Sequence, residues 1–229
     1  MSSSPALSRR LAAEAVGTFV FVLVGAGSAL GTPANSDPSS SLLIAALANG
    51  LGLAMAVSAT MGTSGGVLNP AVALGLLVGG KLRSRDVVPY AVAELAGATF
   101  AGGALVLVFP SSLGNPVHWG APTLSAGISA LQGIGIEALL TFVLVIAVFG
   151  TAVDGRAPHI GGLGIGLAVL ADVLVGGTLT GAAMNPARAY GPMIAGAFFP
   201  SYWYVYLAGP VLGAIAAGLV YRYAFETKQ

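Results

Sequence analysis

The 229-residue sequence is 56% hydrophobic, and only 7% of its residues are charged. A soluble domain carries about 25% charged residues, so the composition excludes an ordinary soluble protein and indicates a polytopic membrane protein with one domain, residues 1–229. The formal net charge of +1 argues against a nucleic-acid partner, and the absence of cysteine excludes disulfide and thiol chemistry.

Six apolar segments are close to the ~20 helical residues that cross a hydrocarbon core. In chain order they are Leu11–Leu30, Ser41–Met61, Val87–Phe109, Ile128–Phe149, Ile160–Val175 and Trp203–Tyr223, the fifth being short. The two arginines before the first segment also fit a signal peptide. However, Glu14 is out of place in the apolar part of such a peptide, and the fourth segment repeats the pattern of the first. We therefore expect six spans.

Two further apolar stretches, Pro70–Gly79 and Pro186–Ala195, are too short to cross, because about ten helical residues measure only ~15 Å. Two such half-helices placed end to end would together span ~30 Å. A glycine-rich loop precedes each one. Non-helical backbone at membrane depth is tolerated only where protein buries it or water lines it, so we expect both loops to face a cavity.

Each half-helix begins with the same tripeptide, and the two copies are Asn69-Pro70-Ala71 and Asn185-Pro186-Ala187. Asparagine is a favoured N-cap, and proline fits the first helical position because its missing N–H has no partner there. Either copy alone is compatible with an ordinary helix start. Two copies with matched flanks, each a hydroxyl residue, a glycine and small residues, indicate a duplicated functional element.

Basic residues predict the orientation of the chain. With six spans and both termini inside, every Lys and Arg except Arg188 falls on the cytoplasmic side, and the loops at Pro33–Ser40 and Pro110–Thr123 contain none. Arg188 is then a cation within the membrane or at its outer face. We expect an integral, multi-pass protein of the cell membrane, with its N- and C-termini in the cytoplasm.

The two halves of the chain repeat one another. The tripeptides are 116 positions apart, and at that offset tyrosine and glycine positions of the third span recur in the sixth. Glu14 in the first span matches Glu137 in the fourth, and each is followed by threonine four residues later. Three spans per half is an odd number, so the halves enter the membrane in opposite orientations. The sequence predicts inverted repeats at about 8–109 and 128–225, with the site at the midplane between them.

These residues match a known family. The paired Asn-Pro-Ala motifs, the run from Met184 to Arg188, the Glu-x-x-x-Thr pairs and the tyrosine and glycine pattern are together very specific. Over nearly its whole length the chain resembles the aquaporin, or major intrinsic protein, family, and Gly176–Pro192 is similar to plant tonoplast channels. The resemblance implies an all-α membrane fold of six helices and two half-helices, one pore per subunit, a homotetramer in lipid, and a channel rather than an enzyme.

The central residues indicate how such a pore excludes ions. In an inverted repeat both half-helices direct their N-termini, each with about half a positive charge, at the pore centre, where they repel cations. A water molecule that accepts from both Asn69 and Asn185 cannot also accept from neighbouring waters, which hinders proton hopping, as in aquaporin-type pores generally. Arg188 adds a full charge to the wall. The sequence contains no nucleophile, metal cluster or cofactor motif.

The family narrows its pore at four positions, which correspond here to Asn49, Val173, Ala182 and Arg188. Strict water channels usually have an aromatic residue at the first and a histidine at the second, so we expect a wider filter. The glycerol-facilitator branch has an Asp where this chain has Ala189. Water should pass together with ammonia, glycerol or urea. Alternatively, neighbouring side chains refill the space, or Asn49 bonds a neighbouring helix.

Four acidic residues lie within the expected spans. Glu14 and Glu137 should accept hydrogen bonds from loop N–H groups and so hold the half-helices. Glu94 stands where the family usually has glutamine, and is either protonated or bonded to a neighbouring helix. Asp172 precedes a filter position, and since one residue turns a helix by ~100° it should point away from the pore.

Other functions remain compatible with the sequence. An ion-coupled secondary transporter also has inverted repeats and broken helices, and proton coupling would then involve Asp172. A structural junction protein with a closed pore is disfavoured by the polar residues along the path. His118 and His159 fall in loops and should be solvated, although His159 would also allow gating by pH.

Overall fold

The computed structural model describes residues 5–33, 35–156 and 160–226, and within these ranges the regular structure is helical throughout, with no strand. Six helices are long and apolar enough to span a membrane. They are α1 (Leu7–Gly31), α2 (Pro38–Ser64), α4 (Ser84–Val108), α6 (Ala130–Val148), α7 (Gly161–Thr180) and α9 (Val205–Val220). π-helical turns η2 (Phe149–Val153) and η3 (Tyr221–Phe225) extend α6 and α9. The predicted all-α membrane fold is confirmed.

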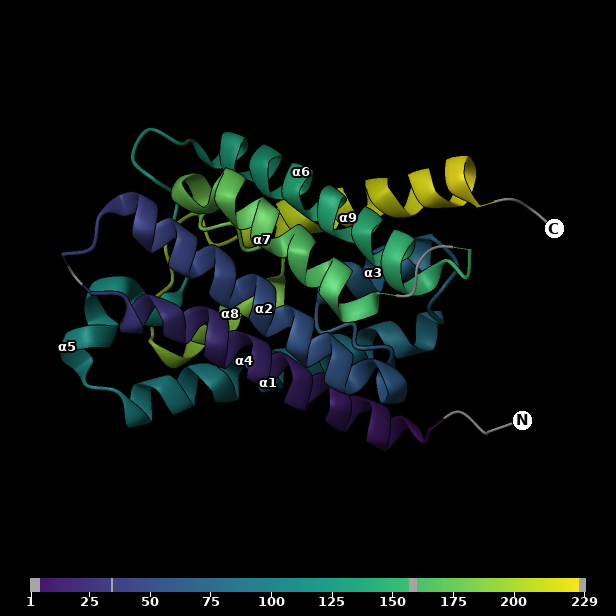
Figure 1. Cartoon of the computed structure of the whole chain (residues 1–229), viewed down its shortest axis with the longest axis horizontal. Helices are drawn as coiled ribbons and strands as arrows, with labels where there is room; N and C mark the ends of the chain where they lie inside the picture. Colours follow the sequence, from purple (N-terminus) through teal and green to yellow (C-terminus); the bar gives the residue numbers. More distant parts are fainter. Residues whose placement is uncertain (1–4, 34, 157–159, 227–229) are drawn as a thin grey trace.

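The two half-helices are α3 (Pro70–Val78) and α8 (Pro186–Ala195). Figure 1 shows the start of α1 and the end of η3 at one end of the bundle and α5 (Ser111–Gly114) at the other, as six crossings require. α3 lies toward the first end and α8 toward the second. The half-helices therefore enter from opposite ends of the bundle.

Each half-helix packs on the last long helix of the other half of the chain. α3 contacts α9, and α8 contacts α4. α2 and α7 run side by side along the seam between the halves, while α1 contacts α4 and α6 contacts α9. The exchange of half-helices makes the two halves share one core.

The fifth span is longer than expected, because α7 continues past Val175 to Thr180. Gly176 and Gly177, which make the sequence look like a helix end, are instead close contacts. A Cβ on Gly176 would lie 2.4 Å from Leu140 Cδ1, and a Cβ on Gly177 would lie 2.7 Å from Leu42 Cδ1. Tertiary packing thus outweighs the cost of about 1 kcal/mol that glycine carries in a helix.

The loop expected at 110–123 is also more structured than its sequence suggests. It contains α5 and the short helix η1 (Asn115–Gly120), and it buries Trp119, whose Nε1 donates to Asn115 Oδ1 at 3.2 Å. His118, expected to be solvated, is half-buried and stacks on Phe198 with ring centroids 3.8 Å apart. His159 lies outside the described residues.

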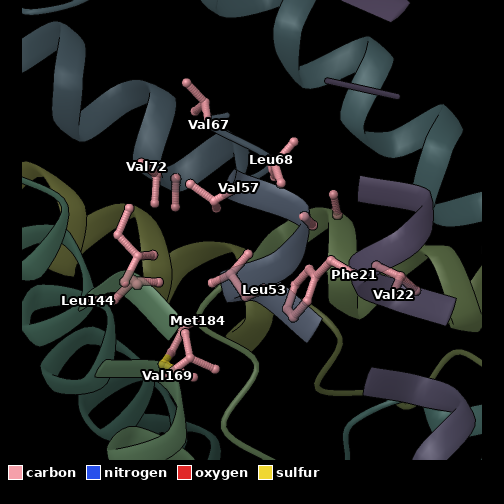
Figure 2. Close-up of a cluster of buried hydrophobic side chains, with 14 of the residues drawn as sticks. Phe21, Val22, Leu53, Val57, Val67, Leu68, Val72, Leu144, Val169 and Met184 are labelled. Carbon is pink, nitrogen blue, oxygen red and sulfur yellow. The ribbon is translucent and has the colours of Figure 1, made fainter. Parts of the chain in front are cut away.

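Hydrophobic side chains from both halves meet around the loops that precede the half-helices. Figure 2 shows Leu144 of α6, Val169 of α7 and Met184 close together, with Leu53 and Val57 of α2 on the other side. The outer faces are apolar as well: Leu107, Leu131 and Phe100 are 86%, 80% and 72% exposed. Large exposed apolar side chains on every long helix are consistent with a lipid environment.

Backbones come closest where glycines repeat at matched positions. A Cβ added to Gly97 in α4 would lie 2.1 Å from the Ala15 carbonyl oxygen in α1. A Cβ on Gly213 in α9 would lie 2.1 Å from the Ala138 carbonyl oxygen in α6. Small residues that let backbones approach are the usual interface of membrane helices. These contacts set the distance between the first and last helices of each half.

We predict that Gly97→Ala destabilises the protein, because overpacking a tight contact costs about 1–3 kcal/mol and here the new atom meets backbone. Thermal unfolding in detergent, followed by size-exclusion chromatography, measures the effect. Gly103→Ala in the same helix is the matched control, since a Cβ there meets nothing within 4 Å. Equal stability of the two variants would contradict the role of this contact.

Candidate functional site

Two matched loops form the centre of the molecule. α2 ends at Ser64 and α7 at Thr180, and in each case the next residue is a left-handed glycine, Gly65 (φ 98°) or Gly181 (φ 80°). An L-residue with a side chain rarely adopts such angles, so glycine fits both positions. After each glycine the backbone turns back toward the centre through four more residues and then enters the half-helix.

The asparagines cap the half-helices through their oxygen atoms. Asn69 Oδ1 accepts from the backbone N–H groups of Ala71 (2.9 Å) and Val72 (3.4 Å). Asn185 Oδ1 accepts from Ala187 (2.9 Å) and Arg188 (3.2 Å). Because the oxygen is engaged in the cap, each amide nitrogen must point away from its own half-helix.

The amide nitrogens bridge the two halves. Asn69 Nδ2 donates to the Met184 carbonyl oxygen at 2.9 Å, and Asn185 Nδ2 donates to the Leu68 carbonyl oxygen at 2.8 Å. An amide nitrogen carries two N–H groups, so each asparagine keeps one further donor. Both asparagines line the central cavity. The arrangement therefore presents two N–H donors side by side to whatever occupies that cavity.

The residue before each asparagine is held in an unusual conformation. Leu68 (φ 51°) and Met184 (φ 53°) are buried residues with left-handed backbones. Such a conformation costs of order 1–3 kcal/mol for a residue other than glycine and persists only where its surroundings fix it. Here the carbonyl oxygen of each is held by the opposite asparagine, and its N–H by a buried glutamate.

These glutamates are Glu14 and Glu137, both fully buried. Glu14 accepts from Val67 N at 3.1 Å and Leu68 N at 2.7 Å. Glu137 accepts from Ala183 N at 2.9 Å and Met184 N at 2.7 Å. A carboxylate can satisfy several N–H groups that would be costly to leave unpaired. Each loop is thus tied to the first helix of its own half.

Two matched tyrosines complete the loops. Tyr90 Oη donates to the Ser64 carbonyl oxygen at 2.8 Å, and Tyr206 Oη donates to the Thr180 carbonyl oxygen at 3.0 Å. Both hydroxyl groups satisfy a carbonyl at the end of a long helix, where the helix itself offers no donor. The repeat of tyrosines at an offset of 116 is visible in the sequence, but their role depends on tertiary contacts that the sequence does not reveal.

The central cavity has a volume of about 220 Å³. Since one water molecule needs about 10–15 Å³ of such space, the cavity has room for several. Its lining includes the three asparagines Asn49, Asn69 and Asn185 as well as Lys81 and Val153. Its walls are otherwise largely apolar, and the apolar side chains come mainly from α2, α3, α6 and α7, with Phe21 from α1. A narrow apolar channel with a few polar groups at its centre suits a file of small neutral molecules.

Of the four expected filter residues, Asn49 and Ala182 line this cavity. The amide nitrogen of Asn49 donates to the Ala45 carbonyl oxygen at 2.9 Å, within its own helix rather than to a neighbouring one. Its oxygen faces Gly25, where an added Cβ would lie only 2.4 Å away. One amide N–H of Asn49 is left for the cavity.

Val173 and Arg188 are buried, at 3% and 7% exposure, and are not part of the lining of this cavity. Arg188 Nη1 has no hydrogen-bond partner among the described groups. An unpaired buried donor of a cation is costly. Nη1 of Arg188 thus keeps its hydrogen-bond donors without an acceptor among the described groups.

Two acidic residues have unpartnered oxygens within the described ranges. Asp172 is 4% exposed, its Oδ2 lacks a partner, and it does not line the cavity. Glu94 is fully buried, and neither of its oxygens has a partner. Across the described ranges, no three or more acidic or histidine side chains gather closely enough to hold a metal ion.

Charged groups surround the end of the cavity near the chain ends. Lys81, which lines the cavity, pairs with Glu226 at 2.7 Å, and this carboxylate raises the pKa of the lysine. The Arg156 guanidinium beside Asp154 holds the pKa of that carboxyl well below its usual range. These exposed pairs stabilise the fold little. The Lys81–Glu226 pair nevertheless joins the loop before α4 to the C-terminal segment, and Arg156 joins the segment after α6 to it by donating to the Phe225 carbonyl oxygen at 2.8 Å.

Comparison with known proteins agrees with this geometry. The family model for the major intrinsic protein matches residues 1–221. Aquaporin TIP4-4 of Zea mays is 42% identical over 220 residues, covering 93% of this chain and 85% of its own. Probable aquaporin TIP3-2 of Arabidopsis thaliana is 39% identical over 234 residues, with 97% and 85% covered. The X-ray structure of an aquaglyceroporin from Plasmodium falciparum superposes with a TM-score of 0.84 at 23% identity, over 96% of this chain and 97% of its own, and shows the same fold.

We predict that Glu14→Leu and Glu137→Leu each lower the yield of folded protein and its thermal stability. Each substitution leaves two buried backbone N–H groups without an acceptor, at about 1–3 kcal/mol apiece. The fraction of monodisperse protein after detergent extraction, with its melting temperature, measures the loss. Val16→Leu, at a position of α1 that is 60% exposed, is the control and should be neutral. Normal folding with an altered solute selectivity would rule out the scaffold role.

Proposed function

The chain belongs to the major intrinsic protein family, and on that premise we propose that it passes water and small neutral solutes while excluding protons and ions. Family membership itself makes the protein a passive, multi-pass membrane channel and not an enzyme. The ion-coupled transporter, which an inverted repeat alone leaves open, finds no support in this family.

The observation that carries the proposal is the pair of amide nitrogens at the centre of the cavity. Asn69 and Asn185 each use one N–H to hold the opposite loop. The remaining N–H of each is available to the same passing oxygen. A water that accepts from both has its own hydrogens turned outward along the pore, so it cannot relay a proton. The positive ends of α3 and α8 add repulsion for cations.

For the selectivity filter we propose Asn49, Val173, Ala182 and Arg188. None of the first three is aromatic or charged. Val173 also lacks the hydrogen-bonding group of the histidine that strict water channels usually have at this position. Arg188 and Asn49 together supply N–H donors and Val173 an apolar wall. Such a filter suits ammonia first, and glycerol or urea next.

We propose one channel domain of residues 1–229, built from inverted repeats at about 8–109 and 128–225. The subunit would assemble as a homotetramer in the cell membrane, with both termini in the cytoplasm. The apolar outer faces of the long helices support contacts with lipid or with other copies. Arg10 lies near the start of α1, and Lys81 and Arg156 contact Glu226 and Phe225 at the end of η3. The start of α1 and the end of η3 lie at the same end of the bundle, so this cluster of basic residues supports the cytoplasmic assignment.

We predict that the purified protein in liposomes speeds osmotic shrinkage with a low activation energy and carries no proton current. Stopped-flow light scattering and a pH-sensitive dye in the same vesicles measure the two fluxes. Arg188→Val should weaken the exclusion of cations while water flux persists, because it removes the full positive charge from the wall. A proton conductance comparable to the water flux would contradict the mechanism.

We also predict that the unmodified channel conducts ammonia, with smaller fluxes of glycerol and urea. The double variant Val173→His with Asn49→Phe should suppress the larger solutes and spare water, because both new side chains are bulkier than those they replace. Side-by-side stopped-flow assays of the four permeants measure this. Background permeability of the unmodified channel to all three solutes, with normal water flux, would show that the filter is narrow.

A further inference from the structure

The two glutamates that hold the loops have different sets of donors. Glu137 accepts a third hydrogen bond, from Thr180 Oγ1 at 2.6 Å, in addition to its two backbone N–H groups. The residue that matches Thr180 in the first half, at the offset of 116, is Ser64. Its hydroxyl donates to the Thr60 carbonyl oxygen at 3.4 Å instead of to Glu14. The first half therefore lacks the hydroxyl donor that the second half has.

In the first half a second acidic side chain, Glu94, lies beside Glu14. It lies on α4 one turn before Gly97, and a Cβ on Gly97 would lie only 2.1 Å from the carbonyl oxygen of Ala15, the residue after Glu14. The close approach of α4 to α1 at this point brings the Glu94 and Glu14 carboxyl groups next to each other. Glu94 is fully buried, and although the backbone N–H of Asn69 approaches it, neither oxygen accepts a hydrogen bond of normal geometry from the described groups. The matching residue in the second half is Pro210, whose side chain has no donor. The loop glutamate of the second half therefore has the Thr180 hydroxyl beside it, whereas the loop glutamate of the first half has the Glu94 carboxyl group.

Two carboxyl groups in contact, both fully buried, cannot both be ionised without a compensating cation. The neighbouring elements supply none. From α1 the facing titratable group is Glu14 itself, and from the loop before α3 it is only the backbone N–H of Asn69 that approaches. On α8, Arg188 acts on Glu137. Arg10 lies only one turn before Glu14 on α1, but its guanidinium is already paired with Asp86 and bonded to Tyr90, so it does not compensate a charge on Glu94.

We propose that Glu94 is a protonated carboxylic acid that donates a hydrogen bond to the Glu14 carboxylate, and that it thereby positions residues 65–69 and the pore asparagine Asn69. Glu94 is a positioning residue, since it acts on the pore only through Glu14 and the loop. Its role rests on the proposed function only in that Asn69 serves the pore. A glutamine at this position supplies the same donor from its amide and cannot titrate.

Infrared spectroscopy of the full chain in liposomes tests the protonation directly. The difference spectrum between the unmodified protein and Glu94→Gln at neutral pH should show the loss of one carbonyl band of a protonated carboxylic acid, shifted in D₂O. Asp172→Asn is the matched control, because Asp172 is the other buried acid with an unpartnered oxygen. The band lost in Glu94→Gln must still be present in the spectrum of Asp172→Asn. A spectrum in which Glu94→Gln removes only carboxylate bands, or no band, would overturn the proposal.

Hydrogen exchange tests the positioning role within one molecule. Glu94→Leu should speed exchange of the Val67 and Leu68 amides and leave the matched Ala183 and Met184 amides unchanged, whereas Glu94→Gln should protect all four as the unmodified protein does. Equal effects on both loops, or a Gln variant that behaves like the Leu variant, would contradict the proposal. If Glu94→Leu does not fold, the infrared comparison decides. Neither readout requires solute flux, so a failure of the proposed channel function remains distinguishable.

Discussion

Two reciprocal hydrogen bonds at the centre of the molecule constrain everything around them. Asn69 holds the Met184 carbonyl and Asn185 holds the Leu68 carbonyl. A single bond of this kind contributes only about 1 kcal/mol net, so the pair is unimportant as a source of stability. Its consequence is geometric. With the oxygen of each amide in a helix cap and one N–H on the opposite loop, the direction of the remaining N–H is fixed.

The strained backbones, buried glutamates and close glycine contacts around the two asparagines all support these two hydrogen bonds. For each carbonyl to face the opposite asparagine, Leu68 and Met184 must adopt left-handed backbones, which are unfavourable by themselves. The buried carboxylates of Glu14 and Glu137 hold the N–H groups of the same residues. The close glycine contacts then bring the helices that carry these carboxylates near enough to the last helices of each half. The N–H and the carbonyl oxygen of Leu68, and likewise those of Met184, are therefore all hydrogen-bonded, which restrains both loops.

Much of this fold could be predicted from the sequence, because the chemistry concerned is local. The six apolar runs, the helix starts at the two asparagines and the match of Glu14 to Glu137 are all visible in the order of residues. The end of α7 could not be predicted in this way. Gly176 and Gly177 look like a helix terminus in the sequence, and only the structure shows that Leu140 and Leu42 pack against them. The same holds for the buried Trp119, which lies in a segment that looks like an exposed loop.

The candidate site could likewise be predicted only in part. Which residues reach the centre follows from the repeat, but how they bond does not. Asn49 lies in the cavity wall as its position suggests, yet its amide bonds Ala45 within its own helix, because Gly25 leaves room for the oxygen on the other side. The repeat is also imperfect where it matters. Ser64 and Thr180 occupy matched positions and make different bonds, and only three-dimensional contacts reveal which neighbour compensates.

Neutron diffraction from crystals of the protein in D₂O would show how the two asparagines meet the central water, because it locates the hydrogens on both amides and on the water between them. We expect one water oxygen that accepts from Asn69 Nδ2 and Asn185 Nδ2 together, with both deuterium atoms of that water directed outward along the pore. A central water that donates a hydrogen bond to either asparagine, or an amide whose oxygen faces the cavity, would contradict it.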